Sequence, residues 1–347
     1  MKYTALSNSN IAIVKYWGKR DYDLNLPTNN SISFTMDDQL QTITTVELDP
    51  SLKHDELSLN GQQGTEKETN RVEKFLDILR KMVKTKAHAR VYSKNSFPKS
   101  AGLASSASGF AALAAAGSKA FELDLSLKEI SILARQGSGS ASRSVFGGAV
   151  EWHAGKLKNG SDSYSEQLSP PDKWKDLRNV IAIISEEEKK ISSVEGMKRI
   201  AHSKLFKQRL IDVGKRLQIV RSAVKNNDFQ AMAYEIMQDS DNMHAVMADS
   251  EPPVVYLNNT SNEVRKKVME FNQQNGFDCH YDPSVGWDTS SNPVAAYTFD
   301  AGPNAHVYTT AKYANQIEKI LKETNGVKRV LICGIGQGIR FSNAHLF

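Results

Sequence analysis

The sequence predicts an α+β fold in two halves, residues 1–185 and 186–347, on three observations. The first half alternates short β-branched runs with segments of helical periodicity, as a mixed sheet with covering helices does. The second half opens with a long helical stretch and closes with a small antiparallel set of strands. The 347 residues, 40% hydrophobic and 24% charged, suffice for one large domain or two modest ones.

Strands are predicted in the first half wherever apolar and β-branched residues cluster over a few positions. Runs of this kind lie at 2–14, 31–48, 88–92, 148–153 and 179–184. Helices are predicted where apolar side chains recur at helical spacing, over 66–86 and 126–135. A further helix is predicted in the Ala-rich run that ends at Ala120.

In the second half, helices are predicted by the same periodicity over 204–247, 261–275 and 311–324. The runs VAAYTF and AHVYT flank the turn sequence DAGPN and therefore predict a β-hairpin over 294–309. The run KRVLIC at 328–333 predicts a last strand. The polar segment 280–293, with Pro and Gly, is long for a connection and is expected to be a loop.

Composition excludes several classes of protein. The 44 basic and 39 acidic residues leave a slight positive excess that suits anionic small substrates, and no basic run interleaved with aromatic residues indicates nucleic acid. The basic clusters at 80–86 and 204–215 are interpreted as solvated helix faces. With two cysteines, no signal peptide and no apolar run long enough to span a bilayer, we expect a cytoplasmic protein without disulfides or membrane contact.

Residues 98–113, PKSAGLASSASGFAAL, form the most informative stretch of the chain. Small residues and two serines, Ser105 and Ser106, lead directly into the Ala-rich helix. A helix N-terminus presents unpaired N–H groups and the positive end of the helix dipole, which together attract phosphate. The stretch predicts a nucleotide phosphate loop, and an ordinary serine cap on a packed core helix is the alternative.

Residues 10–21, NIAIVKYWGKRD, place three cations within six positions at the end of an apolar strand. Such cations repel one another unless an anion lies among them. If strand alternation continues, Lys15, Trp17 and Lys19 share one face, and the two amines converge on one anion. The alternative is a positively charged strand end with Trp17 in the core.

Residues 137–148, GSGSASRSVFGG, alternate glycine and serine around a single arginine. The glycines and serines expose N–H and O–H donors, and Arg143 offers a bidentate guanidinium for carboxylate or phosphate. The segment lies between a predicted helix and a predicted strand, which suits a binding floor better than the alternative, a flexible surface loop.

Asp300 ends a predicted strand in the stretch AYTFDAGPNA and lies beside Phe299. Partial burial raises the proton affinity of a carboxylate, so Asp300 is a candidate base, although these residues taken alone favour the alternative, an Asx-turn residue in DAGPN. Arg71 could direct its guanidinium into the same site or could be an ordinary surface arginine. Ser203 is a weaker candidate.

The chain resembles the diphosphomevalonate decarboxylase family of the GHMP kinase superfamily in four stretches, taken in order. They are NIAIVKYWGKRD with LNLPTNNSIS, PKSAGLASSASGFAAL, GSGSASRSVFGG and AYTFDAGPNA. The small-residue loop is shared across the superfamily, whereas KYWGKRD and TFDAGPNA are specific to the family. The resemblance implies a GHMP kinase fold, with an S5-like first half, a ferredoxin-like second half and the site in the cleft between them.

The resemblance also implies a reaction and its residues. The reaction is the decarboxylation of mevalonate 5-diphosphate to isopentenyl diphosphate, with ATP and Mg²⁺ as cofactors, through phosphorylation of the tertiary hydroxyl. The implied catalytic residues are Asp300, Lys15 and Arg143. The implied substrate-binding residues are Tyr16, Trp17, Gly18, Lys19, Arg71, Ser138, Gly139, Ser140, Ala141, Ser142 and Ser203. The implied ATP-binding residues are Gly102, Ala104, Ser105, Ser106 and Ser108, with Ser106 also on the metal. A homodimer is expected by family analogy.

Other functions remain open at this point. Some relatives in the family decarboxylate mevalonate 5-phosphate, and some act on mevalonate 3,5-bisphosphate without ATP. Others only phosphorylate the tertiary hydroxyl. The presence of both Lys15 and Asp300 argues against the kinase, and Lys19 with Arg71 favours a diphosphate over a monophosphate. A catalytically silent sensor with a kinase fold is a further alternative, against which the intact Asp300 and Arg143 count.

Overall fold

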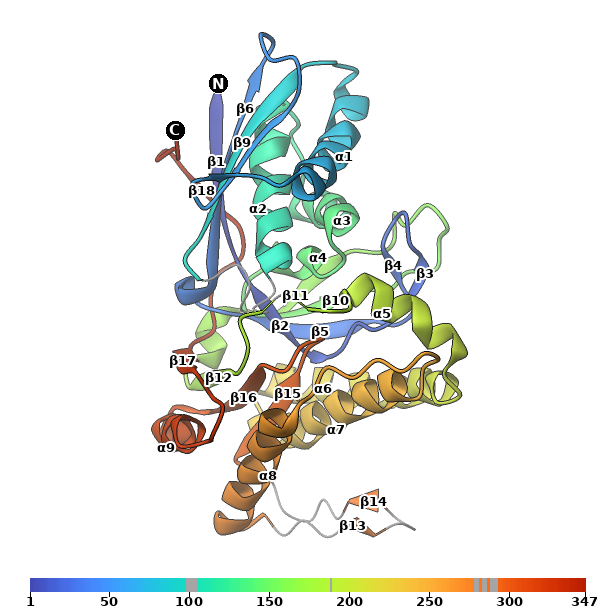
Figure 1. Ribbon diagram of the computed structural model, residues 1–347, viewed down its shortest axis with the longest axis vertical. Coiled ribbons are helices and arrows are strands. Elements are labelled where there is room, and N and C mark those ends of the chain that lie inside the picture. The colour runs from blue at the N-terminus through green and yellow to red at the C-terminus, as the bar shows by residue number, and fades with distance from the viewer. Residues whose placement is uncertain (98–104, 188, 278–280, 283–285, 288–292) are drawn as a thin grey trace.

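The computed structural model describes residues 1–97, 105–187, 189–277, 281–282, 286–287 and 293–347. Three larger sheets organise these residues, and helices cover them (Figure 1). Both chain termini lie beside the same sheet, at the end of the molecule drawn uppermost. The mixed helix and sheet content confirms the predicted α+β class.

The first sheet has six strands in the order β18-β1-β6-β9-β7-β8. Their bounds are β1 (Lys2–Asn8), β6 (Gln41–Asp49), β7 (Glu56–Leu59), β8 (Gln62–Gln63), β9 (His88–Asn95) and β18 (Arg340–Ser342). Three helices lie over one face of it, α1 (Glu66–Val83), α2 (Ser105–Ala120) and α3 (Leu127–Gly137) (Figure 1). The Ala-rich α2 packs directly on β1 and β6, because small side chains allow a helix to approach a sheet closely.

The second sheet lies at the centre of the molecule, with strand order β11-β10-β5-β2. Its strands are β2 (Asn10–Val14), β5 (Ser31–Thr35), β10 (Ala149–Trp152) and β11 (Ser165–Ser169). A short helix, α4 (Ala141–Ser144), precedes β10. The small ribbon of β3 (Lys19–Asp21) and β4 (Leu26–Pro27) projects from this region, between β2 and β5 in the chain.

The third sheet has the order β15-β16-β12-β17. Its strands are β12 (Leu177–Ile183), β15 (Ala295–Phe299), β16 (Ala305–Thr310) and β17 (Arg329–Cys333). The accompanying helices are α5 (Ser193–Arg199), α6 (Phe206–Asn226), α7 (Phe229–Ala248), α8 (Asn259–Gln274) and α9 (Ala311–Lys322). The pairing of β15 with β16 around residues 300–304 confirms the predicted hairpin. The two-residue strands β13 (Tyr281–Asp282) and β14 (Gly286–Trp287) pair with each other, and the rest of segment 280–293 lies largely outside the described residues.

The long helix predicted over 204–247 is wrong, because the structure forms two helices there. Asn227 adopts a left-handed conformation with φ of 58°, which ends α6. The Asp228 side chain then accepts a hydrogen bond from the backbone N–H of Ala231 and caps α7. The Asn-Asp pair carries the turn that helical periodicity alone did not reveal.

Three strand pairings cross the predicted boundary at residues 185 and 186. Strand β12 precedes the boundary and pairs with β16 and β17 on its other side. Near the end of the chain, β18 returns to pair with β1. A large apolar core joins the second and third sheets, with Ile11, Phe34 and Tyr308 among its fully buried side chains. The boundary itself stays a prediction.

None of the helices in the described part of the chain is both long and apolar enough to cross a membrane.

A buried ion pair links α6 to the central sheet. Arg221 donates two hydrogen bonds to the Glu151 carboxylate, Nε to Oε2 at 2.8 Å and Nη2 to Oε1 at 2.7 Å. The Glu151 side chain is 1% exposed and also accepts from Asn30. These contacts hold the pKa of Glu151 below its ordinary value although burial opposes them.

We expect Arg221→Met to lower the free energy of unfolding by about 1–3 kcal/mol at neutral pH, because Glu151 is left charged and buried. A carboxyl whose pKa is depressed in the folded state stabilises above its unfolded pKa and loses that contribution as pH falls through the folded value. The difference between variant and wild type should therefore shrink below pH 4, in urea titrations read by circular dichroism. Arg178→Met, which removes an arginine bonded only to backbone carbonyls, is the control; an equal loss there would contradict the role of the pair.

Candidate active site

The site is built around an ion pair between Lys15 and Asp300. The Lys15 Nζ atom lies 2.6 Å from Oδ1 of Asp300. Lys15 directly follows β2 and Asp300 directly follows β15, and both strands are buried along their whole length. The Lys15 side chain is 2% exposed and that of Asp300 is 31% exposed, so the pair opens to solvent on the carboxylate side.

The charges around Asp300 set its protonation. Burial alone would raise the pKa of this carboxyl, but Lys15, and then His306 and Lys189, hold the pKa at about 2. The expectation that burial raises the proton affinity of Asp300 is therefore wrong, because the neighbouring cations outweigh the loss of hydration. Asp300 is ionised at neutral pH.

Arg143 lies buried near the pair, with 3% of its surface exposed. Its Nε donates to Oδ1 of Asn10 at 3.0 Å, and Nη1 donates to Oγ of Ser31 at 2.5 Å. Burial lowers the pKa of Arg143 to about 10, while Asp300 and Tyr16 act in the opposite direction. The guanidinium therefore stays charged at neutral pH in a fixed orientation.

Tyr16 presents a buried hydroxyl that has no hydrogen-bond partner among the residues that the structure describes. Its ring packs edge-on against Trp152, with centroids 4.7 Å apart. Gly139 lies against it, since a Cβ at that position would come within 3.0 Å of the Tyr16 hydroxyl. A buried hydroxyl seldom remains unpaired in a native protein, so this one indicates a ligand or water partner.

Lys19 is held apart from the Lys15 pair. Its Nζ atom donates to Oδ1 of Asn25 and lies 5.4 Å from the centre of the Tyr22 ring. Burial, with Arg71 and Lys198 acting in the same direction, lowers the pKa of Lys19 to about 8. Cations this close to one another make a site for a multiply charged anion.

The predicted convergence of Lys15 and Lys19 on one anion through strand alternation is wrong in its geometry. Strand β2 ends at Val14, and Gly18 turns the chain with φ of 119° before β3 begins. Gly18 is tightly enclosed, because a Cβ there would meet Thr28 Oγ1 at 2.7 Å. Trp17 is 3% exposed and packs in an apolar cluster with Met197, Ile200 and Met247, which is the core alternative.

The N-terminal end of α2 brings several predicted residues together. Ser106 is exposed, and its Oγ lies 3.3 Å from Oγ of Ser138. Ser108 lies two residues further along and is buried, with its hydroxyl bonded to Thr42 on the first sheet and to Ser9, which lies between β1 and β2. Gly102 and Ala104 lie outside the described residues.

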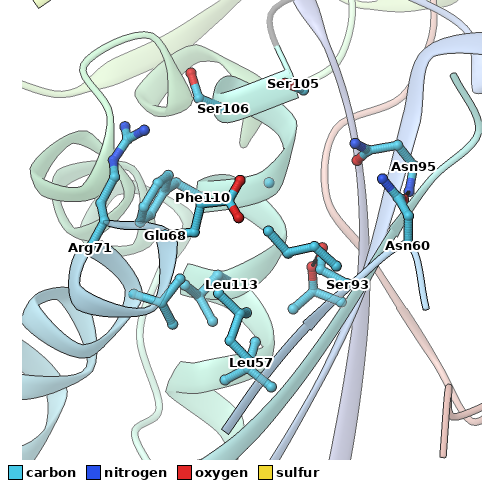
Figure 2. A pocket seen from close by; sticks show the side chains of 15 residues that line it. Leu57, Asn60, Glu68, Arg71, Ser93, Asn95, Ser105, Ser106, Phe110 and Leu113 are labelled. Atoms are coloured by element: carbon cyan, nitrogen blue, oxygen red, sulfur yellow. Dashed lines mark hydrogen bonds between the residues drawn. The ribbon is translucent and has the colours of Figure 1, made fainter. Parts of the chain in front are cut away.

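A cavity of about 170 Å³ lies between α1, α2 and strands β7 and β9 (Figure 2). Ser105 and Ser106 lie at one end of it, and Arg71 comes from α1. Its walls are apolar, with Leu57, Val91, Phe110 and Leu113 among them, and its polar groups include Asn60, Ser93 and Asn95. A cavity of ~150 Å³ accepts a group the size of a benzene ring, so this one suits an aromatic ring.

Arg71 joins the cavity to the cations. One of its nitrogens, Nη2, donates to the carbonyl oxygen of Gly137 at 2.9 Å, and its guanidinium lies 4.5 Å from the centre of the Phe110 ring. It also lowers the pKa of Lys19. Arg71 thus lies between the α2 end and the Lys19 region.

The structure places the remaining predicted residues in other contacts. The Ser140 carbonyl accepts from Asn10, Ala141 is fully buried, and Ser142 bonds to Ser131 and Ser165. Ser203 donates to Oδ2 of Asp249 at 2.7 Å, before the start of α6.

Several residues of the site were not predicted. Asn10 and Ser31 hold Arg143, and His306 and Lys189 line the small pocket that contains Asp300. Asn60, Ser93 and Asn95 line the cavity of Figure 2. Asn10 and Ser31 lie within quoted motifs, so their polar side chains in otherwise apolar strands were an available signal; the three cavity residues carry no local signal.

Comparison with known proteins gives a consistent result over nearly the whole chain. Residues 7–165 match the model of the "diphosphomevalonate decarboxylase-like N-terminal domain", and residues 179–331 match that of the "mevalonate 5-diphosphate decarboxylase C-terminal domain". A diphosphomevalonate decarboxylase of Candida albicans is 43% identical over 315 residues, which cover 86% of this chain and 82% of the relative.

Solved structures agree with this. The mevalonate diphosphate decarboxylase of Staphylococcus aureus is 34% identical, with a TM-score of 0.88 over 99% of this chain and 98% of that one. A structure described as MDDEF in complex with MVAPP, AMPPCP and magnesium is also 34% identical, with a TM-score of 0.87 over 99% of both chains. At these identities and coverages the likeness extends to the fold of the whole chain.

We expect Lys15→Met to raise the pKa of Asp300 by more than one unit. Burial raises this pKa, and the variant lacks the nearest positive charge that lowers it. The pKa is measured by ¹³C NMR of the aspartate carboxyls in the folded protein. Lys189 lowers the pKa of Asp300 less than Lys15 does, so Lys189→Met should raise that pKa by less. Equal shifts in the two variants would contradict the dominant role of Lys15.

Proposed function

Because the chain belongs to the diphosphomevalonate decarboxylase family, we propose that Lys15, Arg143 and Asp300 carry out its ATP-dependent decarboxylation of mevalonate 5-diphosphate to isopentenyl diphosphate. The observation that carries the proposal is the ionised carboxylate of Asp300 against the Lys15 ammonium, with Arg143 fixed close by. The protein is a carboxy-lyase of isoprenoid biosynthesis that uses ATP and Mg²⁺.

The reaction has two stages. In the first, the tertiary hydroxyl oxygen bonds to the γ-phosphorus of ATP, and the bond from that phosphorus to the bridging oxygen breaks to release ADP. In the second, the carbon–oxygen bond to the new phosphate breaks with its electron pair on the phosphate. The electron pair of the bond to the carboxylate carbon forms the carbon–carbon double bond, and carbon dioxide leaves.

Asp300 orients the tertiary hydroxyl and accepts its proton late in the first stage. A pKa of about 2 makes it a weak base but a permanently charged hydrogen-bond acceptor. Phosphoryl transfer passes through a loose transition state in most analyses, so it depends more on positioning than on early deprotonation. Lys15, which holds the carboxylate, stabilises negative charge on the transferring phosphoryl group.

Arg143 binds the carboxylate of the substrate. Its Nε and Nη1 atoms are engaged by Asn10 and Ser31, which fixes the plane of the guanidinium. An arginine held in this way pairs with a carboxylate in a defined orientation. The orientation places the carbon–carbon bond for cleavage when the tertiary phosphate departs.

Tyr16, Lys19, Arg71 and the backbone near Gly139 hold the diphosphate. The unpartnered Tyr16 hydroxyl and the lowered pKa of Lys19 both support an anion at this place. An anion relieves the repulsion among the cations and raises the pKa of Lys19 towards its ordinary value. Several cations suit a diphosphate better than a monophosphate, which favours the diphosphate over the alternative mevalonate 5-phosphate.

The N-terminal end of α2 would hold the phosphates of ATP, and the cavity of Figure 2 would hold its aromatic base. Ser105 and Ser106 provide hydroxyls at the positive end of the helix dipole, close to Ser138. Among the described residues, no group of three or more His, Cys, Asp or Glu could hold a metal. Ser106 therefore fits a Mg²⁺ bound mainly by phosphate oxygens, where the ion neutralises charge on the transferring phosphate.

We further propose that the protein is a cytoplasmic homodimer. Cys333 is buried and unpaired, as in a reducing compartment. Sedimentation velocity at micromolar concentration tests the oligomeric state, and a single species at the 38.5 kDa monomer mass would contradict the dimer.

The substrate is tested by incubating the protein separately with mevalonate 5-diphosphate, 5-phosphate and 3,5-bisphosphate, with and without Mg-ATP. We expect equal amounts of ADP, phosphate and carbon dioxide from the diphosphate with Mg-ATP. ADP without carbon dioxide would identify a kinase, and carbon dioxide from the bisphosphate alone would remove the need for ATP. Binding without turnover of any of the three would favour a sensor.

We expect Asp300→Asn to lower kcat about 10³-fold or more, since the charged acceptor for the hydroxyl is lost. ATP affinity, measured by calorimetry, should change little because Asp300 does not line the cavity proposed for the base. Asp172→Asn on the surface serves as the matched control. A loss below tenfold would indicate that Asp300 is only a turn residue.

A further inference from the structure

We propose that Asp239 and Ser240, neighbours on α7, position the Lys15–Asp300 pair by holding the backbones of the two strand ends that carry it. The inference rests on the proposed function, because it assigns a second layer of residues to the same site. Neither residue is bonded to the side chain of Lys15 or Asp300 in the described structure. They are therefore positioning residues rather than catalytic ones.

Asp239 holds the end of β2. Its Oδ2 atom accepts a hydrogen bond from the backbone N–H of Lys15 at 2.6 Å. The carbonyl of the same residue accepts from Nδ2 of Asn29 at 3.1 Å. Both polar groups of the Lys15 peptide backbone are thus bound by side chains at the position where the strand ladder has ended, which restricts the direction of the lysine side chain.

Ser240 holds the end of β15. Its Oγ atom accepts a hydrogen bond from the backbone N–H of Phe299 at 3.0 Å. Phe299 immediately precedes Asp300, so this bond sets where the strand releases the catalytic carboxylate. Helix α7 packs on both β2 and β15, and the two adjacent residues reach one strand each.

The Asp239 carboxylate is itself fixed by two arginines of α6. Arg209 Nη1 lies 3.3 Å from Oδ1, and Arg216 Nη1 lies 3.2 Å from the same oxygen. Asp239 and Arg209 are both 0% exposed. The sequence predicted that the basic cluster at 204–215 is a solvated helix face. This is only partly correct, because Arg209 is buried in the core.

Burying these charges has a cost, which indicates that they serve more than packing. A buried ion pair is often replaced by apolar residues of similar volume with no loss of stability. Here the Oδ2 atom of Asp239 accepts a hydrogen bond from the backbone N–H of Lys15. An apolar side chain could not make this bond. Misplacing a reacting group by about 1 Å can cost 10²-fold in rate.

Asp239→Asn and Ser240→Ala test the proposal. We expect each to lower kcat about 10–100-fold with the KM values for mevalonate 5-diphosphate and ATP changed less than about threefold. The pKa of Asp300, followed by ¹³C NMR, should rise because the contact with Lys15 loosens. Ser240→Thr retains the hydroxyl and should restore most of the kcat and the wild-type pKa.

Matched controls separate positioning from stability. Glu235→Gln lies one turn earlier on α7 and removes a charge there, while the glutamine oxygen can still accept the hydrogen bond from Arg216. Ser250→Ala removes a buried hydroxyl just after α7 that bonds to Met247 and Pro252. Both should keep wild-type kcat and the wild-type pKa of Asp300, whatever their effect on the unfolding midpoint.

Folded variants of Asp239 and Ser240 with wild-type kcat and Asp300 pKa would overturn the proposal. Losses no greater than those of the two controls would overturn it as well. If Asp239→Asn does not fold, Ser240→Ala and Ser240→Thr decide. A wild-type protein that releases no carbon dioxide would refute the proposed function instead, and the Asp300 pKa in Ser240→Ala would still test the positioning, since that measurement needs no turnover.

Discussion

The contact between Lys15 and Asp300 is the interaction on which the rest of the site depends. Its two atoms lie 2.6 Å apart, although their residues are separated by almost the whole chain. One strand from the central sheet and one from the third sheet must end at the same point for the pair to form. The shared apolar core of these two sheets brings the strand ends together, with Phe34 and Tyr308 in contact across it.

Burial makes the charges of the site costly, and mutual arrangement offsets that cost. Asp300 keeps a pKa of about 2 only because Lys15 lies against it, and Arg143 stays charged with its pKa lowered to about 10. The Nζ atom of Lys19 donates to the amide oxygen of Asn25 rather than to a carboxylate, and the pKa of Lys19 is lowered to about 8. The described site is therefore richer in cations than in anions and favours an anionic substrate.

Local patterns predicted the elements well and their terminations less well. The hairpin of β15 and β16 was predicted because DAGPN is a strong turn signal between two apolar runs. The break at Asn227 was missed because a left-handed residue interrupts a helix without interrupting its apolar periodicity. The strand alternation predicted through residues 15–19 is wrong because Gly18 turns the chain. The raised proton affinity predicted for Asp300 is wrong because the prediction considered burial and left out the neighbouring positive charges.

By itself the sequence determined the α+β class, most of the strands and helices and the family resemblance, and it named Lys15, Arg143 and Asp300 as the candidate central residues. These follow from local periodicity and from short motifs, which need no knowledge of distant contacts. Only the tertiary structure decided the burial of Trp17, the bond of Ser203 to Asp249, the cavity between α1 and α2 and the bonds from α7 to both strand ends. Each of these depends on which residues distant in the sequence become neighbours, and hydrophobic packing settles that globally.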